Sequence, residues 1–403
     1  MKSVLFYIIL FGFGFSPLFA QLNFDASNQL LWEINRPHHR PSYIYGTIHL
    51  NDPRLFNFPD SVYFAFNHTD VFCPEIEVTD LFPLLKTTYN QKLLVNNEGK
   101  IYSLSKLDSV TSYGSIFGWP QFLDAYFYQI AVNSEKSVIP LETIEQQTDA
   151  FSAVQYRPLS MQFSFSQNEL IKTYLSGNLS KLQKITQQGF MGSTGYDELI
   201  LKRNATMVKK LDSLLKRKSC FVAVGAGHLP GKYGILTALV QKGYRVRPIV
   251  VEYAKKQTSD EVKFNQFRNF HYSNDSLHFQ MTFGMKPVQN DNGEFLSLET
   301  RDLGQANVYL LEVEKVDSSS MDIQQYLDEN FYQPINAKIK NVKANDGTIG
   351  YEGIISLEGY GLCWRRVFFK NGFLYKLTCS GSFPFMISNR PQLFFSKFKF
   401  TGK

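Results

Sequence analysis

The stretch FVAVGAGHLPGKYGILTALVQKGYRVRPIV, residues 221–250, decides the fold of the first half of this 403-residue chain. Its apolar start predicts a strand, the glycine-rich GAG predicts a tight turn, and Gly243 ends the helix that follows before a second apolar run begins at Arg245. A strand, a helix and a parallel strand in this order form a βαβ unit, and α/β proteins keep their sites on the loops at the carboxyl edge of such a sheet. His228 lies on one of these loops.

The same alternation of short apolar runs and longer helical patterns extends outward over residues 30–253. It predicts an α/β domain, residues 21–253, whose sheet is flanked by helices. We expect strands at Tyr43–Thr47, Val71–Ile76, Val138–Leu141, Phe221–Val224 and Arg245–Val251. We expect helices at Pro83–Leu94, Pro120–Val132, Ile144–Ala153, Gln167–Leu175 and Asp197–Leu215.

The pattern changes after a polar run at residues 254–263, which we interpret as a linker. Residues 264–403 alternate like antiparallel strands, with one helix expected around Met321–Phe331, so a second, α+β domain with an antiparallel sheet is predicted. An Asn371-Gly372 hairpin would place Cys379 opposite Trp364, with Cys363 on the other face of the sheet, which argues against a disulfide between the two cysteines.

The first 20 residues resemble a secretory signal peptide, with Lys2, an apolar run and a small residue before Gln21. We expect the mature protein to be secreted or periplasmic, with no transmembrane segment after cleavage; the alternative is a single membrane anchor, for which the run is short. The net charge of +6 is small for this length and forms no basic stripe, so nucleic acid is not an expected partner. Four cysteines are too few for a disulfide scaffold.

Two histidines follow a glycine at the same spacing, His49 after Gly46 and His228 after Gly225, and each comes just past an expected strand. A third expected strand runs into PEIEV, which puts Glu75 at its end and Glu77 two residues on, as an outer or substitute ligand. Two imidazoles and a carboxylate are the donor set of a divalent-metal site, and glycine allows backbone and ligand to approach closely. The usual signatures of serine hydrolases, zinc proteases and phosphate-binding loops are absent from the sequence.

Four blocks resemble those of the TraB/PrgY/GumN family, in the same order: residues 42–78, IPLETIEQQTDAF (139–151), ELILKRNATMV (198–208) and residues 221–250. The resemblance covers about residues 28–252, with Pro74 in place of the usual aliphatic residue. The family is similar to the TIKI metal-dependent proteases, which use Mn or Co, and more distantly to ChaN-like haem-binding proteins. By this resemblance the metal ligands match His49, His228 and Glu75, and the family's LET glutamate and RN arginine match Glu142 and Arg203.

The resemblance implies a secreted, divalent-metal-dependent hydrolase that acts on a peptide or protein substrate, with Mn or Co favoured and Zn as a further candidate. Glu75 is then a metal ligand or the general base for the attacking water. Arg203 stabilises the oxyanion or binds a substrate carboxylate, with Glu142 as a second substrate-binding residue, or the two simply form an ion pair. The alternative function is a non-catalytic protein that binds haem or a peptide through the same histidines.

Overall fold

A six-stranded mixed sheet forms the centre of the first half of the chain in the computed structural model, which describes residues 28–50, 52–82, 93–96, 98–103, 122–153, 166–189, 193–250, 256–303, 306–316, 322–331 and 339–402. The sheet has the order β6-β3-β7-β2-β1-β8. Its strands are β1 (Leu31–Asn35), β2 (Ser42–Thr47), β3 (Val71–Pro74), β6 (Ser137–Val138), β7 (Cys220–Gly225) and β8 (Arg245–Pro248). β2, β3, β6 and β7 run parallel to one another, whereas β1 is antiparallel to both of its neighbours, β2 and β8.

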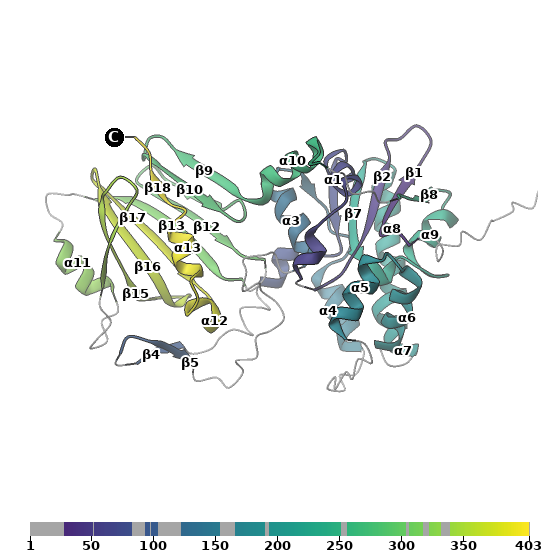
Figure 1. Ribbon diagram of the computed structural model, residues 1–403, viewed down its shortest axis with the longest axis horizontal. Coiled ribbons are helices and arrows are strands. Elements are labelled where there is room, and N and C mark those ends of the chain that lie inside the picture. Colours follow the sequence, from purple (N-terminus) through teal and green to yellow (C-terminus); the bar gives the residue numbers. More distant parts are fainter. Residues whose placement is uncertain are drawn as a thin grey trace, which may run out of the picture.

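Helices surround this sheet. They are α1 (Asp60–Asn67), α3 (Leu123–Asn133), α4 (Ile144–Ala153), α5 (Gln167–Leu175), α6 (Leu179–Gly189), α7 (Ser193–Tyr196), α8 (Arg203–Leu215) and α9 (Ile235–Gln241), with a π-helical segment at Asp197–Lys202. α1 and α3 share one face, where Phe66 and Phe127 contact Phe221 of β7. α4, α5, α6 and α7 gather below the sheet in the view of Figure 1. The predicted α/β fold with a covered sheet is confirmed.

The second half of the chain is built on a seven-stranded antiparallel sheet with the order β11-β12-β13-β17-β16-β15-β14, as predicted. Its strands are β11 (Val288–Asp291), β12 (Phe295–Arg301), β13 (Val308–Lys315), β14 (Lys340–Lys343), β15 (Ile349–Leu357), β16 (Gly361–Lys370) and β17 (Phe373–Ser380). A smaller sheet adds β9 (Phe270–Asn274), β10 (Phe279–Phe283) and β18 (Lys399–Phe400), and three helices are α11 (Ile323–Asn330), α12 (Phe383–Met386) and α13 (Arg390–Phe395).

The Asn371-Gly372 hairpin has the predicted register. Both turn residues have positive φ, 53° and 78°, and Trp364 pairs with Cys379. Cys363 and Cys379 pack into different apolar clusters, one on each face of the sheet, and both are free thiols. The alternation of side chains along a strand therefore keeps the two sulfurs apart.

The structure differs from the sequence prediction in two segments that connect the two halves of the chain. The predicted linker at 254–263 contains most of α10 (Ser259–Asn265), whose Phe264 is fully buried in the core of the first half against Tyr63. A short hairpin, β4 (Leu93–Val95) and β5 (Ile101–Ser103), lies next to the second sheet (Figure 1). Its Ile101 is buried in the apolar cluster of that sheet.

Two predicted segments fall on residues that the structure does not describe. The signal peptide at 1–20 lies outside the described residues, and so does most of the helix expected at Pro83–Leu94, whose last two residues instead begin β4. Within the part of the chain that is described, every helix is too short or too polar to cross a lipid bilayer.

Candidate functional site

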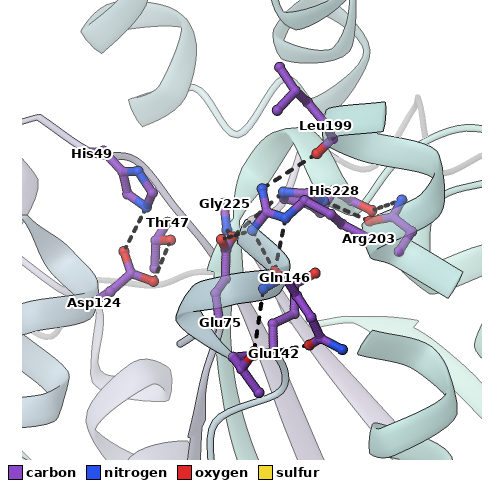
Figure 2. Close-up of polar contacts among 12 residues, drawn as sticks. Thr47, His49, Glu75, Asp124, Glu142, Gln146, Leu199, Arg203, Gly225 and His228 are labelled. Atoms are coloured by element: carbon purple, nitrogen blue, oxygen red, sulfur yellow. Dashed lines mark hydrogen bonds and ion pairs between the residues drawn. The ribbon is translucent and has the colours of Figure 1, made fainter. Parts of the chain in front are cut away.

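Three neighbouring parallel strands end at the same edge of the first sheet and deliver the candidate residues. β3, β7 and β2 lie side by side, and Glu75, His228 and His49 follow their carboxyl ends within three residues. Figure 2 shows Glu75 in the middle, with His49 on one side and His228 and Arg203 on the other. The structure thus brings the five predicted site residues, His49, Glu75, Glu142, Arg203 and His228, to one edge of the sheet.

The glycine of each Gly-x-x-His sequence leaves little room for a side chain. A Cβ atom at Gly46 would come within 3.0 Å of the Ala226 Cβ atom, inside the second Gly-x-x-His segment. A Cβ atom at Gly225 would come within 3.3 Å of the Glu75 Oε1 atom. The two glycines therefore let the loops after β2 and β7 pack against each other and against the carboxylate.

Glu75 is a buried carboxylate with both oxygens engaged. Its Oε1 atom accepts a hydrogen bond from the Gly225 backbone N–H at 2.6 Å, and its Oε2 atom accepts one from Arg203 Nη2 at 2.7 Å. Burial alone would raise the pKa of Glu75, but the neighbouring His228, Arg203 and His49 and the Gly225 N–H lower it well below its ordinary value. Glu75 is therefore ionised at neutral pH.

Arg203 is the first residue of α8 and links two carboxylates. Its Nε and Nη2 atoms donate to Glu142 Oε2 at 2.9 and 2.7 Å, Nη2 also donates to Glu75, and Nη1 donates to the Leu199 carbonyl at 3.4 Å. The ion pair with Glu142 that the sequence left open is present. The other oxygen of Glu142, Oε1, is buried without a hydrogen-bond partner among the described residues, and burial, ahead of the opposing pull of Arg203, raises the pKa of Glu142.

His228 is buried and its ring is held by Asn204. The Asn204 amide nitrogen donates to the Tyr233 carbonyl at 2.9 Å, which leaves Asn204 Oδ1 to accept from His228 Nδ1–H at 2.6 Å. Burial lowers the pKa of His228 to about 4, against the raising effect of Glu75. The ring is therefore neutral at neutral pH, and its Nε2 lone pair lies 3.7 Å from Glu75 Oε1.

His49 lies on the far side of Glu75, with half of its side chain exposed. Its Nε2 atom is 3.4 Å from Asp124 Oδ2, and its ring packs against Phe122 with the centroids 5.3 Å apart. Desolvation lowers the pKa of His49, but the contact with Asp124 and the charges of Asp124 and Glu75 outweigh it and raise the pKa to about 9. The imidazole is therefore protonated at neutral pH in the metal-free protein.

The donor atoms at this edge suit a divalent metal in kind: two imidazoles and the carboxylates of Glu75 and Asp124. They stand as two pairs, His49 with Asp124 and His228 with Glu75. Among the residues that the structure describes, no three His, Cys, Asp or Glu side chains are gathered closely enough to hold an ion as they stand. Three carboxyl groups nevertheless lie buried here: Glu75 and Glu142 share Arg203, whereas Asp124 has no arginine or lysine partner among the described residues.

Glu77 does not join this group. The strand β3 ends at Pro74 and Glu77 begins a 3₁₀ turn, so the face alternation on which its prediction depended no longer applies. Its Oε1 atom accepts a hydrogen bond from Thr79 Oγ1 at 3.1 Å, and a hydrogen bond with Glu77 helps burial to raise the pKa of Tyr128.

Asp124, Thr47 and Asn204 were not among the predicted site residues. Asn204 is the residue after Arg203 in the RN pair, so one turn of α8 supplies both groups. Thr47 ends β2 within the first Gly-x-x-His segment. Asp124 carries no local signal beyond being an acidic residue near the start of a helix, in the first turn of α3.

A family comparison matches the first half of the chain. A model of the TraB/PrgY/gumN family matches residues 30–113 and 105–248. The chain is 24% identical to metalloprotease TIKI2 of Danio rerio, over 58% of its own length and 64% of that protein, and 24% identical to human metalloprotease TIKI1, over 58% and 65%. It thus spans a little less than two thirds of these relatives. Cyanobacterial PsbP from Synechocystis sp. PCC 6803 matches 33% of this chain and 92% of its own at 13% identity, with a TM-score of 0.24.

Proposed function

Because the chain belongs to the TraB/PrgY/gumN family, we propose that it is a divalent-metal-dependent hydrolase that cleaves peptide bonds at the cluster around Glu75. Family membership and the TIKI metalloprotease relatives support a protease-like function at the level of the family. The metal, the peptide or protein substrate and export from the cytoplasm are part of the proposal.

The observation that carries the proposal is the excess of carboxyl groups at the sheet edge. Glu75, Asp124 and Glu142 are all buried, yet among the described residues Arg203 is the one Arg or Lys beside them, and it pairs with Glu75 and Glu142 alone. Charged groups are removed from water at high cost unless they are compensated. A divalent cation would supply the missing positive charge.

Three residues would hold the ion: His228 through its Nε2 lone pair, His49 through a ring nitrogen, and Glu75 through a carboxylate oxygen. A bound divalent ion supplies Lewis-acid polarisation of a carbonyl group and lowers the pKa of the attacking water. We favour Mn or Co, with Zn as the next candidate.

The pKa of Glu75 separates its two candidate roles. A general base works best when its pKa lies near the operating pH, and the pKa of Glu75 is held far below that by His228, Arg203 and His49. We therefore assign Glu75 to binding the ion.

The hydrogen bonds of Arg203 restrict what it does in the reaction. Its bonds to Glu75, Glu142 and the Leu199 carbonyl occupy four of the five N–H donors of the guanidinium. We propose that Arg203 mainly orients Glu75 and keeps Glu142 ionised, and that one Nη1–H is left to bind a substrate carboxylate or oxyanion.

A metal-reconstitution assay tests the proposal. The purified protein is stripped with a chelator, reloaded with Mn²⁺, Co²⁺ or Zn²⁺, and incubated with a peptide library whose cleavage is followed by mass spectrometry. We expect cleavage to return with metal and to be absent in His228→Ala and Glu75→Gln, while His271→Ala, an exposed histidine of β9, cleaves normally.

Two other results would change the proposed function. A Soret band on haem titration, together with no cleavage by the metal-loaded protein, would favour the haem-binding alternative. Peptide binding without cleavage would favour the peptide-binding one. Mass spectrometry of the exported protein tests the signal peptide, because cleavage would give a mature chain that begins at Gln21.

A further inference from the structure

We infer that Asp124 is the positioning residue of His49: it holds the Nε2 side of the ring, so that the ring presents Nδ1 to the ion. The bound ion in this inference rests on the proposed function. The contact between Asp124 and His49 is present in the metal-free protein. No sequence signal had assigned Asp124 to the site.

Asp124 differs from the other buried carboxylates in its partners. Glu33 pairs with Arg247, Glu75 and Glu142 share Arg203, and Glu352 pairs with Arg366. Asp124, only 4% exposed, has no arginine or lysine partner in the described part of the chain, and its charged contact is His49. A buried carboxylate whose one cationic partner is an imidazole is costly for the fold, which indicates a role in the site.

The two oxygens of Asp124 have separate tasks. Oδ1 accepts a hydrogen bond from Thr47 Oγ1 at 3.0 Å, and Thr47 is the last residue of β2, two residues before His49. Oδ2 is completely buried, has no hydrogen-bond partner among the described residues, and lies 3.4 Å from His49 Nε2. Thr47 thus orients the carboxylate, and the remaining oxygen faces the imidazole (Figure 2).

The segment at the start of α3 contacts the His49 ring in two ways. Asp124 meets its Nε2 edge, and Phe122, two residues earlier, packs on the ring at a centroid distance of 5.3 Å and an interplanar angle of 56°. Two contacts from the start of α3 restrict the ring's rotation, although half of the His49 side chain is exposed.

His228 shows the same arrangement with a different acceptor. Its Nδ1–H is bound by Asn204 Oδ1 at 2.6 Å, and its Nε2 atom is left toward Glu75. At His49 the Nε2 atom is held by Asp124, and no described residue makes a hydrogen bond with Nδ1. Metal-binding histidines almost always donate their second ring N–H to a carboxylate or amide oxygen, which fixes the tautomer and raises ligand basicity.

The test compares Asp124→Asn and Asp124→Ala with Glu33→Gln, a control that removes a buried carboxylate of β1 whose partner is Arg247. In the metal-free protein, NMR of the ¹⁵N-labelled histidine rings should show a protonated Nε2 at His49 whose signal shifts in Asp124→Ala, while the His228 Nδ1–H signal is retained. Titration with Co²⁺ should show binding weakened about 10–100-fold in both Asp124 variants and unchanged in Glu33→Gln.

A double-mutant cycle separates positioning from a general structural effect. Asp124→Asn should weaken Co²⁺ binding no further in a His49→Ala background, but should keep its full effect in a His228→Ala background. An effect of equal size in both backgrounds, or an unchanged His49 ring signal in Asp124→Ala, would overturn the inference. If the wild-type protein binds no divalent ion, the proposed function fails, and the His49 ring signal alone then decides whether Asp124 holds the ring.

Discussion

The second sheet and the carboxyl edge of the first sheet differ in how their buried carboxylates are paired with cations. On the second sheet three carboxylates each pair with a cation of their own: Glu352 with Arg366, Glu312 with Arg365 and Glu314 with Lys376. At the edge of the first sheet Glu75 and Glu142 share Arg203, and Asp124 faces the protonated imidazole of His49.

This difference distinguishes charged residues that support the fold from charged residues that we assign to the candidate site. Paired charges across an antiparallel sheet satisfy one another and can be exchanged for apolar residues with little effect on stability. At the carboxyl edge of the parallel strands, by contrast, the carboxylates outnumber their cationic partners. A bound cation would neutralise this excess negative charge. The comparison predicts where mutations will be costly and where they will be tolerated.

The largest effect is expected on activity. His49→Ala and His228→Ala should each reduce metal-dependent kcat/KM by more than about 100-fold, beyond the loss typical of an outer partner of a metal ligand. His271→Ala in the second half should change kcat/KM by less than about twofold. The His271 ring is exposed, and its one hydrogen bond among the described residues is with Thr282. Steady-state kinetics on one peptide substrate make the comparison, and equal losses in all three variants would contradict it.

Ion-pair replacement should distinguish the two halves by stability. Arg366→Met with Glu352→Leu removes a complete pair and should change the free energy of unfolding by about 1 kcal/mol or less. Arg203→Met with Glu142→Leu still leaves Glu75 buried without its arginine and should cost about 3–5 kcal/mol. Urea unfolding of the metal-free variants measures both values, and similar costs would remove the distinction between the halves.

Metal binding should stabilise the first half selectively. At a free metal concentration of 100 times Kd, the gain is about 2.7 kcal/mol. Hydrogen exchange should slow in peptides that cover β2, β3 and β7, while peptides from β15, β16 and β17 exchange as before. Equal slowing over both sheets would show that the ion does not act at the proposed edge.

Glycine replacement should give the smallest difference. Gly46→Ala places a Cβ atom 2.9 Å from Leu229 Cδ1 and 3.0 Å from Ala226 Cβ, so we expect a cost of about 1–3 kcal/mol. Gly284 has open space around it and no positive φ, and Gly284→Ala should change stability by less than about 1 kcal/mol. Thermal unfolding compares the two, and a neutral Gly46→Ala would show that the loops can separate.

Strong local patterns predicted much of the fold. The helices at Ile144–Ala153 and Gln167–Leu175 have the predicted bounds, and the Asn371-Gly372 turn set the register of its hairpin. The βαβ pattern of residues 221–250 placed His228 at the carboxyl edge. These features depend on residues close together in the chain.

Features that depend on distant residues were not predictable. β1 contains Glu33 at a buried position, which weakens the apolar pattern and becomes understandable once Arg247 is seen beside it. α10 looks like a polar linker because its one fully buried residue, Phe264, packs into a core made by other helices. Asp124 matters because Thr47 and His49, more than 70 residues earlier, meet it.

The β4–β5 hairpin has a practical consequence for dividing the protein. A cut near residue 255 would seem to separate two autonomous modules, but it would leave Ile101 on one fragment and the apolar surface that receives it on the other. The C-terminal fragment would then expose this apolar surface to water and aggregate. Adding a peptide of residues 93–103 should restore its solubility. A fusion protein that contains the second sheet must therefore also contain the β4–β5 hairpin.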